Sequence, residues 1–414
     1  MKFLKISLIL FVIIFNSCSS DNIQDDSLNL ENGKFIENDS SFVSISEAKD
    51  IANQIFFSNK KMFSKGNEKK RVTEIKPIGT TENKASYYIV NFEEGGFVII
   101  SSDKRMYPIL AYSEKNNFDL ASENYPDLLV NWLFEQDKYV NDLRKGKIKE
   151  ILKFDEHWKI SSMESRMLKS NKVNLASKTN SARNYTLISS HGPLISTSWG
   201  QGVGYNNSAP NKSCSKYSNG RTPTGCVATA MSQIMKFHSY PNTYNWSIMP
   251  NRVYSSTSTS NGANEISRLM RDAGNSVGMD WGCDSSGADT EDAANALKNT
   301  FGYQSATYSN NYTNAISDIQ TGFPVILKGG RAENWILFKI YRDGHAWVCD
   351  GYELAKVEVK APAGRWGYTW RWVNLSSYHM NWGWNGSWNG WYNGMRNSVG
   401  DFSYKSGVIY NIRK

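Results

Sequence analysis

Three helical patterns followed by four strand patterns occupy the second half of this chain, and their order limits the fold more than any other feature. The helical spacing of apolar residues covers 226–238, 266–277 and 293–301. Short apolar runs, typical of strands, follow at 324–328, 346–349, 378–382 and 408–412. Helices first and strands afterwards predict an α+β fold with a helical lobe and a sheet lobe.

The first half of the chain carries a smaller α+β pattern. Ser44 opens a capping box for a predicted helix. Two apolar runs, 87–92 and 97–101, are joined by Glu-Glu-Gly-Gly and predict a β-hairpin. Pro126 begins a second predicted helix with one apolar face. We expect these elements to form one domain over residues 42–158.

A polar stretch separates the two patterns. Residues 159–184 are rich in Ser, Asn and Lys and carry little apolar periodicity. Exposed segments of this composition are where proteases cut. The length of 414 residues suits two or three domains. We therefore expect a second domain at 185–414, joined to the first by a cleavable linker.

Residues 1–18 have the layout of an export signal. Two lysines precede the apolar run Ile6–Phe15, which is too short to span a bilayer. Cys18 then follows Asn16 and Ser17, as in bacterial lipoprotein signals, although Phe15 stands where leucine is favoured. We expect Cys18 to carry a lipid and residues 19–41 to form a flexible tether. The protein is then an outer-membrane or cell-surface lipoprotein or, without lipidation or after processing, a secreted protein.

Charge and cysteine spacing argue against two classes of partner. The net charge is +8, but the basic residues are scattered and form no stripe, so nucleic-acid binding is not expected. No Cys/His cluster has zinc spacing, so we expect no metal and no cofactor. Cys214, Cys283 and Cys349 have no specific explanation. Buried free thiols are the expectation for them, with one disulfide as the alternative.

Cys226 is the candidate nucleophile. Val227, Ala230, Met231, Ile234 and Met235 form one apolar helical face directly after it. Gly225 breaks the chain before this helix, so Cys226 lies in its first turn. The N-terminal end of a helix favours an anion, and the thiolate is the reactive form of cysteine. A buried structural cysteine is the alternative.

His345 is the candidate base. It follows a glycine and precedes a short apolar strand. His238 lies about three helical turns from Cys226 and cannot reach it; we expect it to be a cation at the helix end. His157 is expected on the surface. His191 and His379 have weaker context.

Two further groups complete the predicted site. Asn381, in Asn-Trp-Gly-Trp, is the candidate to orient the histidine, and Trp382 and Trp384 would shield that hydrogen bond from water. A core asparagine is the alternative reading. Gln201, in Trp-Gly-Gln-Gly, is a candidate side-chain donor to an oxyanion, next to the N–H of Cys226.

Together these segments resemble the streptopain family of papain-like bacterial cysteine peptidases. The resemblance is carried by TGCVATAMSQIMKFHSYP, WGQGVGYN, GMDWGCDSSGA, GHAWVCDGY and HMNWGWNGSWNGWY, which lie within residues 190–414. It implies a two-lobed papain-like fold with Cys226 as nucleophile, His345 as catalytic histidine and Gln201 at the oxyanion. The family's Asn-Trp-Gly-Trp stretch falls on residues 381–384.

The first domain resembles the inhibitory prodomain of the same family, through YYIVNFEEGGFVIISSDKRMYPILAYSE. The resemblance implies a zymogen that cleaves polypeptides after its own prodomain is removed, with a mature chain that begins within 172–190. Two stretches that border the cleft, 329–343 and 353–377, are longer than the family pattern.

A non-catalytic binding protein or protease inhibitor is the main alternative. The run Trp382–Tyr392 could present an aromatic platform to carbohydrate, and the first domain could act as a free inhibitor. A transferase or amidase on the same fold is a third interpretation.

Overall fold

A computed structural model describes residues 40–54, 71–81, 84–122, 125–148, 152–159, 185–330, 344–394 and 407–414. The described residues from Ser41 onward belong to one compact unit. The predicted export signal, Cys18 and residues 160–184 of the predicted linker lie outside the described residues. The predicted domain boundaries therefore stay predictions.

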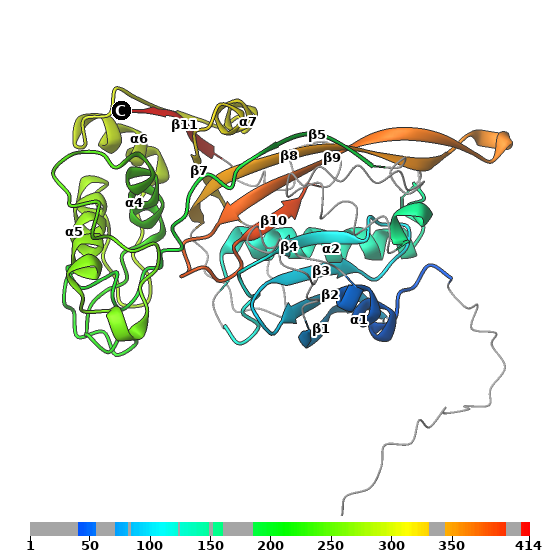
Figure 1. Ribbon diagram of the computed structural model, residues 1–414, viewed down its shortest axis with the longest axis horizontal. Coiled ribbons are helices and arrows are strands. Elements are labelled where there is room, and N and C mark those ends of the chain that lie inside the picture. The colour runs from blue at the N-terminus through cyan, green and yellow to red at the C-terminus, as the bar shows by residue number, and fades with distance from the viewer. Residues whose placement is uncertain are drawn as a thin grey trace, which may run out of the picture. The chain divides into compact units, whose positions relative to one another are not determined.

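One antiparallel sheet runs through both predicted domains (Figure 1). Its order is β1-β2-β3-β4-β10-β9-β8-β7-β11-β6, with β5 on the edge of β8. The first domain contributes β1 (Val72–Thr81), β2 (Lys84–Phe92), β3 (Phe97–Ser101) and β4 (Ile109–Ser113). The second contributes β5 (Tyr185–His191), β6 (Ser305–Ser309), β7 (Val325–Gly329), β8 (His345–Pro362), β9 (Tyr368–Asn381), β10 (Gly390–Asn393) and β11 (Gly407–Arg413).

The two domains meet where β4 pairs with β10. Tyr112 lies opposite Trp391, and Ala111 lies opposite Tyr392. Residues of both domains also share one hydrophobic core. The sequence pattern predicts two folded regions, but nothing in it indicates that their sheets join, because edge pairing depends on backbone groups that every residue carries.

The predicted elements of the first domain are confirmed. Helix α1 (Ile45–Gln54) begins after Ser44, whose hydroxyl accepts the Glu47 N–H at 3.2 Å. Strands β2 and β3 form the predicted hairpin, and Gly95 and Gly96 adopt positive φ in its turn. Helix α2 (Asp127–Arg144) begins after Pro126, and the short helix η1 (Asp155–Trp158) follows it.

The helical lobe is also confirmed, with longer helices than the apolar pattern indicates. Helix α4 (Cys226–His238) coincides with the prediction. Helices α5 (Asn261–Ser276) and α6 (Thr290–Asn299) begin earlier, because Ser260 and Asp289 cap them through their side chains. The lobe also holds η3 (Ser255–Thr257), and α7 (Thr313–Gln320) precedes β7.

Strands β8 and β9 are much longer than predicted. They pair from Val348–Asn381 to Pro362–Tyr368, around the short helix η4 (Gly364–Trp366). The outer half of this hairpin has exposed residues on β9 in succession, so it lacks the alternation by which a half-buried strand is recognised.

The sheet lobe has a different cover on each face. On β7 and β8 the even-numbered residues Ile326, Ala346 and Val348 share a core with helices α4, α5 and α6. The odd-numbered residues Val325, Leu327 and Trp347 share a core with α2 of the first domain. Side chains alternate between the faces of a strand, so the first domain and the helical lobe cover opposite faces of these two strands.

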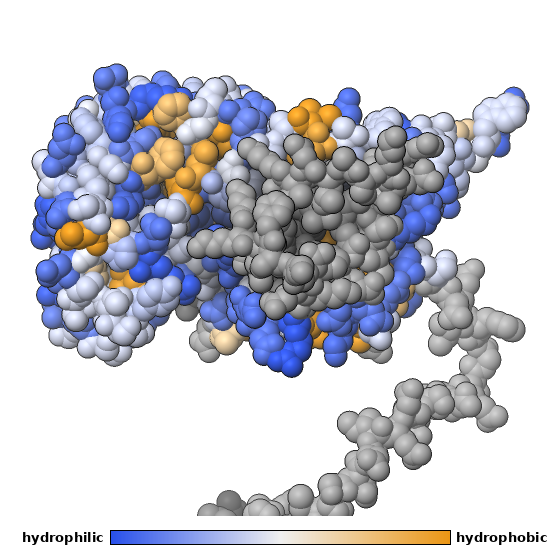
Figure 2. Space-filling view, viewed as in Figure 1, coloured by the Kyte–Doolittle hydropathy of each residue, from blue (hydrophilic) through white to orange (hydrophobic). Residues whose placement is uncertain are grey.

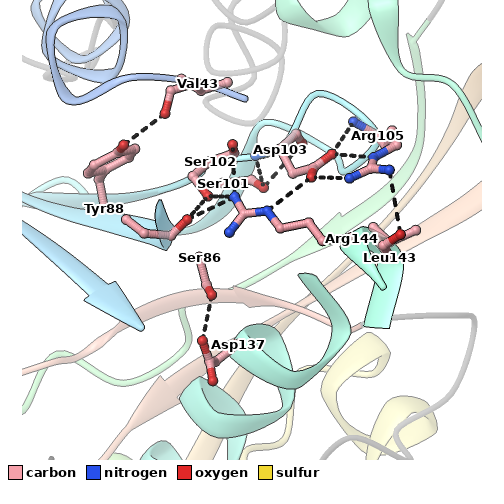
Figure 3. A network of polar contacts seen from close by, with 11 residues as sticks. Val43, Ser86, Tyr88, Ser101, Ser102, Asp103, Arg105, Asp137, Leu143 and Arg144 are labelled. Atoms are coloured by element: carbon pink, nitrogen blue, oxygen red, sulfur yellow. Dashed lines mark hydrogen bonds and ion pairs between the residues drawn. The ribbon is translucent and has the colours of Figure 1, made fainter. Parts of the chain in front are cut away.

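A buried ion-pair network holds the C-terminal end of α2 (Figure 3). Asp103 is fully buried and accepts from Arg105 Nε at 2.8 Å, and it pairs with Arg144 Nε at 3.5 Å. Arg144 also donates to Ala85 O and Ser102 Oγ, both at 2.9 Å. The network fixes α2 to the strands of the first domain, which leaves the other end of α2 over the second.

Candidate active site

Cys226 is the first residue of α4, as predicted. Gly225 has φ +82°, and a Cβ there would lie 2.8 Å from both Met279 Cε and Ser286 O. Only glycine fits this turn, and the turn directs the thiol into the boundary between the lobes. The sulfur accepts the backbone N–H of Ala346, at the start of β8, at 3.5 Å.

Burial raises the pKa of the Cys226 thiol. The N–H groups of Ala346, Val227 and Cys226 itself act in the opposite direction, as expected at a helix N-terminus. The carboxylate of Asp127, at the start of α2, raises the pKa further. The first domain therefore contributes a negative charge that opposes formation of the thiolate.

His345 is the first residue of β8, next to the residue that contacts the sulfur. Its Nε2 lies 2.8 Å from the carbonyl oxygen of Trp382. A carbonyl can only accept, so Nε2 carries the proton and, in the neutral ring, Nδ1 is the basic nitrogen. Burial lowers the pKa of His345 to about 4, and the bond to the Trp382 carbonyl opposes that shift.

Aromatic rings fix the plane of this imidazole. Trp347 stacks on it with ring centres 6.1 Å apart and planes 12° apart. Trp384 meets it edge-on at 4.5 Å. Among the described residues no hydrogen bond joins the ring to Cys226 Sγ. The Cys226 thiol and the His345 ring are close in space but not hydrogen-bonded to each other. The raised pKa of the thiol and the lowered pKa of the imidazole both favour the neutral forms at pH 7.

Asn381 does not occupy its predicted position on the histidine. Its Nδ2 donates to Thr197 O at 2.6 Å, and its Oδ1 accepts from Gln233 Nε2 at 3.2 Å and Gly383 N at 3.3 Å. The carbonyl of the next residue, Trp382, takes the expected role instead. Asn381 connects α4 with the segment that leads to Gln201. It is therefore a structural asparagine of the core, the alternative given by the sequence analysis.

Gln201 has the environment expected of an oxyanion donor. Its side-chain Nε2 is buried and has no hydrogen-bond partner among the described residues. The main-chain carbonyl of Gln201 accepts the N–H of Thr224 at 3.0 Å, and Thr224 lies two residues before Cys226. A buried amide donor without a partner is costly, and its position beside the nucleophile loop suits it to a ligand oxygen.

The tryptophans after Asn381 divide into two roles. Trp384 is half-buried and touches the imidazole, but the hydrogen bond to Asn381 that the prediction has it shield is absent. The ring of Trp382 lies in the core, with its Nε1 donating to Trp388 O at 3.1 Å. Trp388, Trp391 and Tyr392 are buried as well. In the full chain these buried rings face the first domain rather than solvent, so they present no open platform to carbohydrate.

The start of α2 covers the site. Leu128 Cδ1 lies 2.9 Å from where a Cβ on Gly329 would be, and Gly329 pairs directly with His345. Leu128, Leu129 and Trp132 share one core with Trp347 and Trp382. The family resemblance implies that the first domain covers the site, but the sequence does not indicate that α2 makes the contact, because this helix has an ordinary apolar face with no chemical signature.

Two other histidine predictions are wrong. His238 is buried, contacts Tyr303 Oη at 3.2 Å, and has its pKa lowered to about 4 by burial, so it is not a cation. His157 is also buried, and its Nε2 lies 2.9 Å from Glu358 O of β8. Among the weaker candidates, His379 pairs with Asp350 at 2.6 Å, away from Cys226.

The cysteines divide differently from the expectation. Cys214 and Cys283 form a disulfide, which closes a loop of the helical lobe. Cys349 is a buried free thiol whose pKa is raised by burial. Spacing in the sequence could not show which pair would meet.

Two searches of the described residues found nothing further. They contain no helix that has both the length and the apolar character needed to cross a bilayer. They also contain no group of three or more His, Cys, Asp or Glu arranged to hold a metal ion.

Comparisons with known proteins agree with this geometry. Residues 199–243 and 242–392 match the Peptidase C10 family, and residues 40–140 match the Spi protease inhibitor family. Streptopain from Streptococcus pyogenes is 26% identical over 351 residues, which cover 75% of this chain and 74% of that protein. The thiol protease/hemagglutinin PrtT of Porphyromonas gingivalis is 26% identical over 380 residues, 83% of this chain and 38% of that protein.

A solved structure shows the same fold. A fragment of prointerpain A from Prevotella intermedia, carrying a cysteine-to-alanine substitution, aligns with 82% of this chain and 99% of its own length. The TM-score is 0.53 at 23% identity. The papain-like α+β fold preceded by a prodomain is therefore confirmed. The chain belongs to the streptopain family of cysteine peptidases, Peptidase C10, and carries an N-terminal prodomain of the Spi protease inhibitor type.

Proposed function

We propose that the chain is an exported cysteine endopeptidase made as an inactive precursor, with Cys226 and His345 as its catalytic pair. The observation that carries the proposal is the position of the imidazole. Its Nε2–H is held by the Trp382 carbonyl, so Nδ1 is the basic nitrogen, one residue from the N–H that contacts Cys226 Sγ.

In the proposed reaction, Nδ1 of His345 takes the proton of the Cys226 thiol. The thiolate attacks a peptide carbonyl, and the resulting oxyanion accepts from the Cys226 N–H and Gln201 Nε2. The imidazolium then gives its proton to the leaving amine. Water hydrolyses the acyl-enzyme and regenerates the thiol.

The prodomain keeps this pair neutral in the proposed precursor. Burial raises the pKa of Cys226 and lowers that of His345, and Asp127 adds to the first effect. Both shifts disfavour the thiolate–imidazolium pair. Removal of α2 admits water and takes away the Asp127 charge, so both shifts diminish. Cleavage within 159–184, with a mature chain beginning between 172 and 190, is the proposed activation step.

Export completes the proposal. The signal pattern of residues 1–18 supports lipid attachment at Cys18 and a place at the outer membrane or cell surface, or secretion after processing. Incorporation of labelled fatty acid that disappears in Cys18→Ser is the expected result. Unlabelled wild-type protein in the culture medium would instead mean ordinary secretion.

Two precursor variants test the nucleophile. Wild-type, Cys226→Ala and Cys349→Ala precursors are incubated with casein and with a thiol-reactive peptide inhibitor, and the matured chains are sequenced from the N-terminus. We expect casein cleavage and labelling in the wild type, neither in Cys226→Ala, and both in Cys349→Ala, which removes the other cysteine that is free within the described part of the chain. A Cys226→Ala chain that still cleaves casein or its own prodomain contradicts the assignment.

A further inference from the structure

The outer end of the β8–β9 hairpin concentrates exposed aromatic residues. Trp366, Tyr368, Trp370 and Trp372 are 77%, 48%, 49% and 44% exposed. None of them belongs to a described hydrophobic core, whereas Val373 and Leu375, the next apolar residues toward the base, pack against one. Exposed large aromatics gathered in seven residues are unusual on a soluble surface and mark an interaction site.

Three of these rings lie on one face of β9. Tyr368, Trp370 and Trp372 alternate along the strand, so their Cα atoms are about 6.8 Å apart. Their cross-strand partners are Pro362, Lys360 and Glu358, and Lys153 lies 4.1 Å from the centre of the Tyr368 ring. Trp366 lies in the turn itself. The end of the hairpin thus presents aromatic groups both at its side and at its extremity.

Basic residues accompany the rings. Residues 356–372 contain one acidic residue, Glu358, and four basic ones, Lys356, Lys360, Arg365 and Arg371. Lys360 lies 5.1 Å from the centre of the Trp370 ring, and Arg365 lies 4.7 Å from that of Trp366. Such a surface complements an anionic partner.

The shape of this end favours a flat partner. Figure 1 shows the hairpin extending beyond the neighbouring described elements, with η4 at its extremity. In Figure 2 the same end carries blue and nearly white side chains, as basic and aromatic residues do on that scale. Every residue from Tyr368 to Trp372 is exposed, so this end of the hairpin is accessible to a flat surface.

We propose that the hairpin end, residues 356–372, docks the protein on an anionic lipid bilayer. Tryptophan and tyrosine favour the membrane–water interface, where their apolar rings and polar N–H or O–H groups are both accommodated. Lysine and arginine beside them are attracted to anionic headgroups. Because β8 begins at His345, the docked end lies roughly 55 Å along the strand from the candidate base. The active site therefore stays clear of the bilayer.

Vesicle partitioning tests the proposal independently of catalysis. Residues 41–414, which form one compact unit without the signal segment, are mixed with vesicles of phosphatidylcholine alone or with 30% phosphatidylglycerol and sedimented. We expect at least tenfold stronger binding to the anionic vesicles, reduced by 0.5 M salt. The triple variant W366S/W370S/W372S should lose at least tenfold of that binding, and R365Q/R371Q should remove the preference for anionic lipid.

Tyr254→Ser is the matched control. Tyr254 is 59% exposed and lies 5.4 Å from the Arg252 guanidinium, the same kind of pair placed in the helical lobe. It should bind vesicles like the wild type. Unchanged thermal unfolding of the triple variant shows that it is folded. Equal vesicle binding by the triple variant and the wild type overturns the proposal. So does an absence of vesicle binding, including the case in which the hairpin binds a soluble anionic polysaccharide instead.

Discussion

The two faces of the sheet lobe have covers of different chemistry. The face toward α4, α5 and α6 presents small aliphatic side chains such as Ile326, Ala346 and Val348. The face toward the prodomain also has aliphatic residues, Val325 and Leu327, but adds the aromatic rings of Trp347 and Trp382, with Tyr392 beside them. The polar atoms of the last two rings are satisfied within the peptidase domain, since both donate to Trp388 O.

This difference is consistent with the helical lobe as a permanent cover of the sheet and the prodomain as a removable one. An aliphatic face exposed to water has no way to recover its lost contacts, so the helical lobe must stay. Aromatic rings with a polar atom are common at interfaces that form and separate. In the proposed function, the aromatic face is exposed when the prodomain leaves and can then receive a polypeptide. The following predictions test this distinction, from the largest expected effect to the smallest.

Truncating a buried side chain under each cover should give opposite results for the mature enzyme. Trp132→Ala in α2 and Ile234→Ala in α4 each remove a fully buried side chain. We expect a loss of about 3–5 kcal/mol for the first and about 2–5 kcal/mol for the second in the precursor. Once the prodomain is removed, only Ile234→Ala should remain destabilised. Calorimetry of both forms measures this. Because residue 132 leaves with the prodomain, the decisive result is the precursor: a Trp132→Ala precursor as stable as the wild type contradicts α2 as a packed cover.

Asp103→Asn should loosen the prodomain without touching the peptidase domain. The substitution leaves Arg105 and Arg144 beside a neutral group, and breaking a buried ion pair in this way costs about 3 kcal/mol. We expect faster maturation of the precursor and an unchanged kcat of the mature enzyme. Asp142→Asn is the control, since its ion pair with Lys147 is at the surface. Equal maturation rates for the two variants would contradict the role of the network.

Gln201→Ala tests whether the unpartnered amide serves a ligand. Loss of one oxyanion donor lowers kcat by about 100-fold or more. Because Nε2 makes no hydrogen bond within the described chain, thermal stability should stay the same or rise. The measurement is kcat and KM of the mature enzyme on a peptide substrate, with Gln201→Glu as a second variant of the same shape. A stability loss with unchanged kcat would make Gln201 structural.

Acid should lower the stability of the precursor through His345. The pKa of His345 is lowered in the folded state, here from 6.5 to about 4, so above pH 6.5 the ring is neutral both folded and unfolded and has no effect on stability. As the pH falls from 6.5 toward 4, the unfolded chain binds a proton that the folded chain does not. The free energy of unfolding therefore falls by up to about 1.4 kcal/mol per pH unit. Calorimetry of Cys226→Ala precursors with and without His345→Gln isolates the effect of His345. The other buried histidine with a lowered pKa, His238, is present in both proteins. Parallel pH profiles for the two would show that His345 is not shielded.

Much of the site follows from local signals, and the rest does not. The helix after Cys226 is predictable because its apolar spacing and the preceding glycine act within a few residues. Ser260 and Asp289 show why two helix starts were placed too late: their capping bonds extend each helix beyond its apolar stripe. The sequence favours Asn381 as the partner of the histidine because a side chain can be read from the sequence, whereas the Trp382 carbonyl that holds the ring cannot.

The sequence by itself determined the α+β class, the thiol at a helix N-terminus and the histidine at the start of a strand. Those features depend on neighbouring residues, whose spacing is written in the chain. The tertiary structure alone decided that the prodomain joins the peptidase sheet through β4 and β10, that Cys214 bonds Cys283, and that a carbonyl orients His345. Each of these depends on where distant segments meet. Strand pairing and the carbonyl on His345 also involve backbone groups, which are the same in every residue and leave no mark in the sequence.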